Sequence, residues 1–304
     1  MLSRLVLLPF VALSFLSPTS AHVSIWHPSM FGFNVTAHTF SWDNRPVVPL
    51  ANLPFTKWWF HGHLDYPPHP GDLFELPAGG KATLEVACDK GFTSYWASNE
   101  GGDIRSSNQR NYPCPGSPTS QFHTVDEQDV TGCALAITYT PDARSVKPND
   151  FVVFSVNHKC VWSRMTEFEI PGDMPLCPEG GCTCAWFWIH SPRSGEEQMY
   201  MNGFKCTVTN SRPGAPALAR PQLARRCGFD KYNNVQADPK NCTQGAKLPF
   251  YWKQAEGNSM FEGYYSPPLY NELYNFKHGA QNDIFVTSQP QKPCSVKAQS
   301  FKER

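Results

Sequence analysis

The stretch Cys184-Ala-Trp-Phe-Trp-Ile-His190 decides the fold, because it is a short apolar and aromatic run with the length and composition of a β-strand. Similar runs recur along the chain, each bounded by Gly, Pro, Asn or Asp: residues 82–87, 133–139, 151–156 and 204–209. Several alternate apolar and polar residues, as in a sheet that packs on one face. Many short strands separated by turn residues predict a mainly β protein, an immunoglobulin-like or fibronectin-like antiparallel β-sandwich with long loops.

The composition supports this fold class and narrows the possible partners. The 304 residues include 28 Pro and 21 Gly, and 13% are aromatic, which favours short strands and ordered loops over helices. The formal net charge is zero, so nothing indicates a nucleic acid or an anionic membrane as a partner. Beyond the N-terminal leader no apolar run is long enough to span a bilayer. We therefore expect a soluble protein that is a monomer.

Residues 1–21 have the features of a secretory signal peptide. Arg4 supplies the positive start, residues 5–16 are apolar, and the segment ends in small residues at Ala21. Cleavage after Ala21 would leave His22 as the first residue of a secreted, extracellular protein.

The cysteines agree with secretion. All eleven lie beyond the leader, and an oxidising compartment favours disulfides. Because the number is odd, at least one thiol is free or pairs outside the chain. Cys177, Cys182 and Cys184 are close enough to suggest a zinc knuckle, but no second Cys/His pair follows at zinc-finger spacing, so disulfides are favoured. Asn34 and Asn241 begin N-glycosylation sequons.

A change in composition divides the mature chain. The stretch Ser211-Arg-Pro-Gly-Ala-Pro-Ala217 ends the strand pattern. We expect a β-sandwich core over residues 22–210, an extension rich in Pro, Tyr and Asn over 211–297, and a flexible polar tail over 298–304. Three cysteines lie in the extension, which indicates that disulfides hold it and that it packs on the core.

The N-terminal histidine carries the strongest chemical signal. His22 would present a free α-amine and an imidazole on one residue, and together these can chelate one metal ion. A third nitrogen from a distant histidine would complete a T-shaped site, a geometry and donor set that suit copper. His61 and His63 form an H-x-H pair beside an aromatic segment, whereas His123 lies in a loop ahead of the 133–139 strand. The H-x-H pair favours a surface or structural role, whereas His123 is better placed as the source of the third nitrogen, because a loop histidine just ahead of a core strand can be held rigidly at the edge of a sandwich.

Three further segments carry a family resemblance. The sequence Trp186-Phe-Trp-Ile-His190-Ser, then Gly195-Glu-Glu-Gln198-Met-Tyr200, then Phe204-Lys-Cys206-Thr-Val208 resembles the C-terminal signature of the fungal cellulose-active oxygenases of auxiliary activity family 9. The resemblance implies that Tyr200 is the axial group over copper, and that Gln198 and His190 lie beside the metal and position oxygen. One additional residue separates the glycine from the glutamine here.

The N-terminal part of the chain is similar to a narrower family. The stretch His22-Val-Ser-Ile-Trp-His-Pro, the segment Lys57-Trp-Trp-Phe-His-Gly-His63 and the Gln-Phe-His123 loop resemble auxiliary activity family 14, lytic polysaccharide monooxygenases described as xylan-active. The resemblance covers the mature chain to about residue 280. It implies one copper ion held by His22 and His123, with Tyr200 axial. It also implies oxidative cleavage of xylan, including xylan that coats cellulose, with an external electron donor and dioxygen or peroxide.

Three alternatives remain open. The first is a secreted protein that binds copper without catalysis. The second is a carbohydrate-binding wall protein, in which an aromatic platform stacks on sugar rings; its candidate residues, which could equally fill the core, are Trp26, Phe31, Phe33, Trp58 and Trp59. The third and least favoured is a glycoside hydrolase, which needs two carboxylates. The available acids lie in polar loops, where we expect solvated side chains, and are Asp126, Glu127, Asp129, Glu196 and Glu197. The residues that would bind substrate are not predicted.

Overall fold

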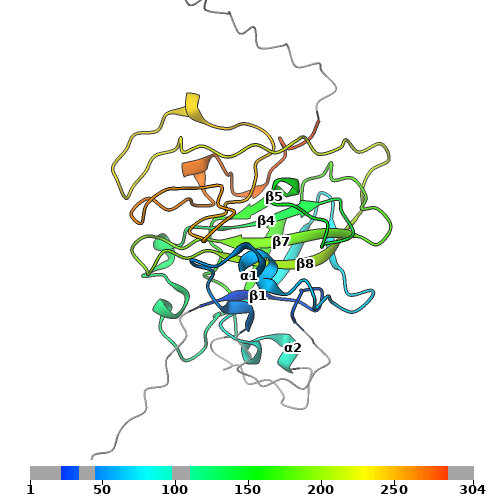
Figure 1. The fold of residues 1–304 in the computed structure, drawn as a ribbon, viewed down its shortest axis with the longest axis horizontal. Helices are drawn as coiled ribbons and strands as arrows, with labels where there is room; N and C mark the ends of the chain where they lie inside the picture. Colours follow the sequence, from blue (N-terminus) through cyan, green and yellow to red (C-terminus); the bar gives the residue numbers. More distant parts are fainter. Residues whose placement is uncertain (1–21, 34–44, 98–109, 287–304) are drawn as a thin grey trace, which may run out of the picture.

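The computed structural model describes residues 22–33, 45–97 and 110–286 (Figure 1). The predicted leader, the Asn34 sequon, Cys294 and the 298–304 tail lie outside these residues. A three-stranded sheet has the order β1 (Ser24–Trp26), β3 (Lys81–Ala87), β6 (Met165–Glu169). A six-stranded sheet has the order β2 (Phe74–Pro77), β8 (Tyr200–Thr209), β7 (Cys182–Trp188), β4 (Cys133–Thr138), β5 (Val152–Asn157), β9 (Gly279–Ala280).

The helices are short and lie in the connections. The two α-helical turns are α1 (Phe55–Trp58) and α2 (Ser94–Ala97). The 3-10 turns are η1 (Arg45–Val47), η2 (Trp59–Gly62), η3 (Lys90–Phe92), η4 (Thr119–Phe122), η5 (Glu127–Asp129), η6 (Pro148–Asp150), η7 (Pro239–Asn241) and η8 (Glu272–Tyr274). The predicted mainly β sandwich is confirmed, and the immunoglobulin-like subtype stays a prediction. One pairing departs from the antiparallel prediction, since β2 runs parallel to β8.

The six-stranded sheet is buried on both faces, so the expectation of a sheet packed on one face is wrong for its central strands. Every residue of β4 and β7 is buried. Leu135 and Trp186 point into the core between the two sheets. Ala136 and Phe187 point the other way, into a second apolar cluster. Strands covered on both sides read as continuous apolar runs rather than alternating ones.

The second cluster is built largely by loops. It contains aromatic residues of α1 and η2 together with residues of the extension, including Tyr251 and Trp252. The residues considered for an exposed aromatic platform are all buried, in one cluster or the other: Trp26, Phe31, Phe33, Trp58 and Trp59. The alternative that they fill the core is therefore confirmed, and they cannot stack on a polymer at the surface.

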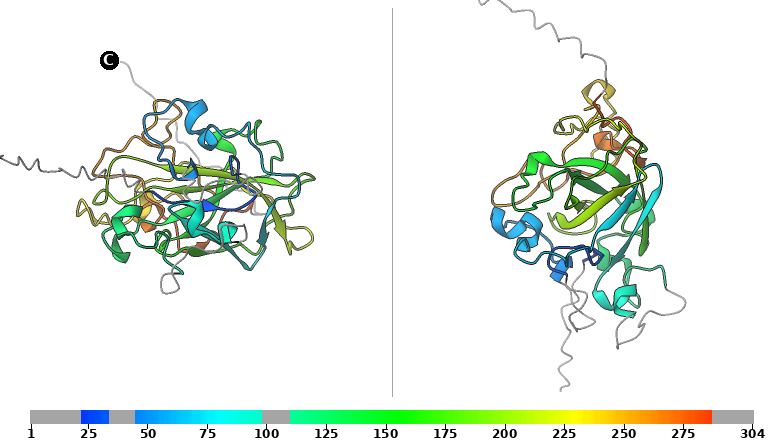
Figure 2. Two further views of the ribbon diagram at one scale, coloured as in Figure 1. Left: turned by 90° about the horizontal axis from the view of Figure 1, so that it is seen from below. Right: turned by 90° about the vertical axis from the view of Figure 1, so that its right-hand side faces the viewer.

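The extension lies along the β5 edge of the large sheet, where the yellow and orange chain is seen in both Figure 1 and Figure 2. Its strand β9 pairs with β5 through Ser155 and Ala280. Its disulfide, Cys227–Cys242, joins two parts of the extension to each other. Hydrogen bonding and apolar contact, rather than this disulfide, hold the segment against the core.

Ten of the cysteines form five disulfides, which confirms the predicted oxidised state. The pairs are Cys88–Cys114, Cys133–Cys160, Cys177–Cys182, Cys184–Cys206 and Cys227–Cys242. The three cysteines considered for a zinc knuckle, Cys177, Cys182 and Cys184, all belong to these disulfides.

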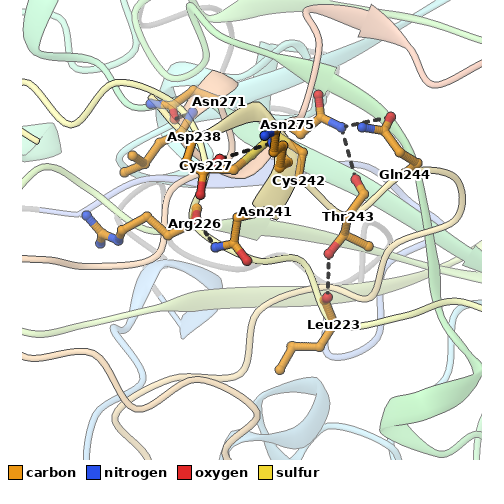
Figure 3. The surroundings of a disulfide bond; sticks show 12 residues. Leu223, Arg226, Cys227, Asp238, Asn241, Cys242, Thr243, Gln244, Asn271 and Asn275 are labelled. Carbon is orange, nitrogen blue, oxygen red and sulfur yellow. Dashed lines mark hydrogen bonds between the residues drawn. A yellow bond between two sulfur atoms is a disulfide. The ribbon is translucent and has the colours of Figure 1, made fainter. Parts of the chain in front are cut away.

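The Asn241 sequon lies at the surface beside the last disulfide. Asn241 is exposed, and its amide donates to the carbonyl of Arg226 at 2.7 Å (Figure 3). The hydroxyl of Thr243 donates to the carbonyl of Leu223. Glycosylation stays a prediction. Over the described ranges, no helix combines the length and apolar character that crossing a membrane requires.

Candidate metal centre

Three side chains from distant parts of the sequence meet at His22. Its Nδ1 lies 3.0 Å from Nε2 of His123 and 2.9 Å from the hydroxyl oxygen of Tyr200. His22 precedes β1, His123 follows η4, and Tyr200 is the first residue of β8. The fold thus brings together the three residues that the sequence singled out as metal ligands.

The first strand fixes the position of His22. Val23 is fully buried, and Ser24 pairs with Ala87 of β3. The indole of Trp26 donates to the carbonyl of Ala87 at 3.0 Å. His22 itself is only partly buried. Burial, and then the neighbouring His123, lower the pKa of the His22 imidazole to about 4.

His123 is held in one orientation by the backbone. It has a left-handed conformation, φ 48°, at the end of η4, and the preceding Phe122 is fully buried. Its Nδ1–H donates to the carbonyl of Ser194 at 2.7 Å. Since a carbonyl can only accept, this bond assigns the proton to Nδ1 and leaves the lone pair of Nε2 directed to His22. Metal-binding histidines are commonly oriented in this way.

Tyr200 is a buried, neutral phenol. Its side chain is fully buried, and its ring packs on Trp188 with centroids 4.6 Å apart. The hydroxyl donates to Oε1 of Gln198 at 3.0 Å. Burial raises the pKa of Tyr200 well above its ordinary value. The phenol therefore stays protonated at physiological pH, and Gln198 keeps its amide nitrogen as a donor.

His190 lies directly behind His123. The two rings are stacked, with centroids 4.3 Å apart and 11° between the planes. Nδ1–H of His190 donates to the carbonyl of Ser191, whereas its buried Nε2 has no hydrogen-bond partner among the described residues. Burial, and then His123, lower the pKa of His190 to about 3. This imidazole is neutral and presents a lone pair, so it can accept a hydrogen bond or a proton.

The H-x-H pair is not part of this group. His61 and His63 lie together, with ring centroids 5.9 Å apart. Nε2 of His61 donates to the carbonyl of Val48 at 2.9 Å, and its Nδ1 lies 3.4 Å from the amide nitrogen of Asn202. Both nitrogens of this ring are used within the fold, so its role here is structural.

The residues at His22 fit a copper ion. Two neutral imidazole nitrogens and a neutral phenol converge, and nitrogen donors of this kind suit copper. Within the described residues no cluster of three or more His, Cys, Asp or Glu side chains is placed to hold a metal. The donor set proposed from the sequence does not need such a cluster, since one of its three nitrogens is the backbone amine of His22.

Comparison with known proteins decides the family. A family model described as lytic polysaccharide monooxygenase AA14 matches residues 4–302. The chain is 60% identical over 277 residues to AA14 family lytic polysaccharide monooxygenase B of Pycnoporus cinnabarinus, covering 91% of this chain and 73% of that protein. The chain belongs to the AA14 family.

Two other AA14 proteins match over most of the chain. AA14 family lytic polysaccharide monooxygenase A of Trametes coccinea is 57% identical over 274 residues, which are 90% of this chain and 63% of that protein. The Talaromyces rugulosus protein of the same family is 25% identical over 289 residues, or 88% of this chain and 93% of that protein. AA14 membership confirms the resemblance and the enzyme class, a copper-dependent monooxygenase that acts on polysaccharide.

Asp129 supports the site in this AA14 chain, a role that sequence reasoning missed. The prediction of a solvated loop acid is wrong for Asp129, which is buried. Its carboxylate accepts from the hydroxyls of Ser191 and Ser194 and from the backbone N–H of Val125. It therefore fixes the loop whose Ser194 carbonyl orients His123. The sequence signal that could have indicated this role is the pair Ser191 and Ser194 beside His190, because buried hydroxyls need a nearby hydrogen-bond acceptor.

Gly195 is the second residue that sequence reasoning missed as a part of the site. Its φ is 146°, and a Cβ at this position would overlap the imidazole of His123. Only glycine permits this close approach of backbone to ring.

The other acids considered for hydrolysis have local partners or lie in solvent. Asp126 caps η5 by accepting from the backbone of Gln128, Glu127 pairs with Lys159, and Glu197 pairs with Lys253. Glu196 is exposed.

Proposed function

We propose that this AA14 protein would hold one copper ion through the α-amine and Nδ1 of His22 and Nε2 of His123, with the phenol of Tyr200 as a further group at the metal. The observation that supports this most directly is the approach of His22 Nδ1 to both His123 Nε2 and the Tyr200 oxygen, at 3.0 and 2.9 Å. The proposal includes secretion after cleavage behind Ala21, since a peptide-bonded His22 would lack the amine. Glycans on Asn34 and Asn241 and a monomeric state belong to the same proposal.

Copper held in this way would supply a redox centre that, with an external electron donor and dioxygen or peroxide, oxidises a C–H bond next to a glycosidic oxygen. The chain contributes orientation and proton control. Ser194 holds His123 in the tautomer that exposes Nε2. The Tyr200 hydroxyl occupies one side of His22 and remains protonated because it is buried. His190 offers a hydrogen-bond acceptor at Nε2, and Gln198 offers an amide donor.

We propose xylan, in particular xylan that coats cellulose, as the substrate. Family resemblance supports this choice, and oxidation of the sugar backbone needs no pair of catalytic carboxylates. The acid near the site also favours oxidation over hydrolysis. The buried carboxylate of Asp129 accepts hydrogen bonds from serine hydroxyls and does not face a substrate.

Electron paramagnetic resonance with copper titration tests the ligand set. We expect the processed protein to give one tight axial cupric signal with nitrogen couplings. The matched control is the same chain with one additional residue before His22, which removes only the free amine at that position. Equal, weak copper binding by both forms would refute the ligand set. If the signal is present, oxidised xylo-oligosaccharides should form from xylan-coated cellulose with a reductant, and a tight site without products would indicate copper binding alone.

A further inference from the structure

A short segment of the extension places three aromatic side chains in solvent. Phe261 is 84% exposed, Tyr265 is 73% exposed and Tyr264 is 38% exposed. We call residues 261–265 the aromatic loop. The Tyr264 and Tyr265 rings contact each other edge to face, with centroids 4.9 Å apart. Grouped exposed aromatic residues usually mark a binding surface, because contact between their apolar faces and water is unfavourable.

The aromatic loop lies next to the candidate copper site. The hydroxyl of Tyr264 donates to the carbonyl of Gly195 at 3.0 Å. Gly195 in turn packs against the imidazole of His123. In Figure 1 and in the left panel of Figure 2, the orange chain that includes this loop lies at the same end of the molecule as the start of β1. One hydrogen bond and one packing contact therefore separate the exposed rings from His123.

A polar cluster around the buried Asp230 holds the end of the loop and the residue after it. Asp230 is 2% exposed and accepts hydrogen bonds from the side chains of Arg226 and Asn233. Asn233 also donates to the carbonyl of Tyr265 at 3.1 Å. Arg226 donates to the carbonyl of Ser266 at 2.7 Å. The backbone at Tyr265 and Ser266 is thus fixed from the protein side.

The middle of the loop is fixed as well. The indole of Trp252 donates to the carbonyl of Glu262 at 2.8 Å, and the hydroxyl of Tyr274 donates to the carboxylate of Glu262 at 3.0 Å. The charge of Glu262 is used for this anchoring, and the exposed groups of the loop are aromatic and uncharged. A surface ordered in advance loses little conformational entropy when a ligand binds.

We propose that Phe261, Tyr264 and Tyr265 form a polysaccharide-binding surface that holds a sugar chain beside His123. Exposed aromatic faces stack on the C–H faces of sugar rings, a contact that suits a neutral, rigid polymer. The proposal rests on the proposed function, since a polymer bound here would be positioned for oxidation at the neighbouring copper site. A polymer chain is favoured over a second copy of this protein because the rings project from a fixed loop directly beside the reactive centre.

The test is depletion binding of the processed, copper-loaded protein to insoluble xylan-coated cellulose, without reductant. The double variant Phe261→Ala/Tyr265→Ala should bind about tenfold or more weakly, since it removes the two most exposed aromatic faces of the loop. Its melting temperature and cupric spectrum should match those of the unaltered protein, because both side chains are exposed. Tyr66→Ala is the matched control, as Tyr66 is 66% exposed and lies outside the aromatic loop; its polymer binding should not change.

Equal polymer binding by the double variant and the unaltered protein would overturn the inference, as would no polymer binding by either. Light scattering coupled to size-exclusion chromatography provides a further test. A dimer that becomes a monomer in the double variant would assign the surface to a second copy and overturn the inference. Loss of the proposed function has a different signature, namely no tight cupric signal in the unaltered protein, whatever the polymer binding is.

Discussion

Two histidine pairs, His22 with His123 and His61 with His63, differ in where their ring nitrogens point. His61 and His63 are separated by one residue, and both nitrogens of His61 are engaged by Val48 and Asn202. His22 and His123 are 101 residues apart, yet Nδ1 of one approaches Nε2 of the other. A ligand site needs lone pairs that converge and are not used by the fold. The spacing of two histidines in the sequence is therefore a weaker guide to metal binding than the hydrogen bonds that their ring nitrogens make in the fold.

The largest effect that would test this comparison is expected from His123→Ala. Removing one of the proposed nitrogen ligands should lower copper affinity by more than the roughly 10–100-fold typical for loss of a supporting group. The axial cupric signal should disappear. Isothermal titration with copper, together with the cupric spectrum, measures both effects.

The control for His123→Ala is His63→Ala in the other pair, which should keep the tight site. If His63→Ala abolished the cupric signal while His123→Ala preserved it, the assignment of the two pairs would be reversed.

A smaller effect is expected from Gly195→Ala. The new Cβ would overlap the His123 ring and displace it from Ser194, so copper affinity should fall by about 10–100-fold, as for other losses of ligand support. Gly214→Ala is the matched control. Gly214 also has a positive φ, 69°, but a Cβ there meets nothing within 4 Å. Titration of both variants separates backbone strain from displacement of the ligand, and equal copper affinities for the two would contradict the proposed role of Gly195.

Local sequence signals predicted the strands and singled out His22, His123 and Tyr200, which the fold brings together. They missed features that depend on tertiary packing. The 184–190 run predicted β7 because its composition and length are those of a strand. It did not indicate that loops and the extension would cover the outer face of β7, which is why Trp58 and Trp59 are buried rather than exposed. Asp129 looked like a solvated loop acid because its serine partners are some sixty residues away.

The exposed aromatic loop was missed for the same reason. Phe261, Tyr264 and Tyr265 lie in a stretch without periodicity, and exposure of an aromatic residue is set by the packing of its neighbours. The hydrogen bond from Tyr264 to Gly195 relates that stretch to the histidines, and no local sequence signal predicts it.

The smallest expected effect is the contribution of His61 to the pH dependence of stability. Burial, and then the neighbouring His63, lower the pKa of His61 from 6.5 to about 3. Below pH 6.5 the unfolded chain binds a proton at His61 while the folded protein does not. The free energy of unfolding should therefore decrease as the pH falls from 6.5 toward 3, by at most about 1.4 kcal/mol per pH unit for this group.

Urea unfolding of the protein and of His61→Gln at pH 7.5, 6, 5 and 4 measures this contribution. Near neutral pH the variant should be less stable, because it loses the hydrogen bond to the carbonyl of Val48. Its stability should then fall less steeply with acid, so the two curves approach each other as the pH decreases. His22 and His190 also have lowered pKa values, but both residues are present in the protein and in the variant. Their contributions therefore cancel in the difference between the two free energies of unfolding. Parallel curves would mean that His61 titrates normally in the fold, which would contradict the engagement of its ring nitrogens by Val48 and Asn202.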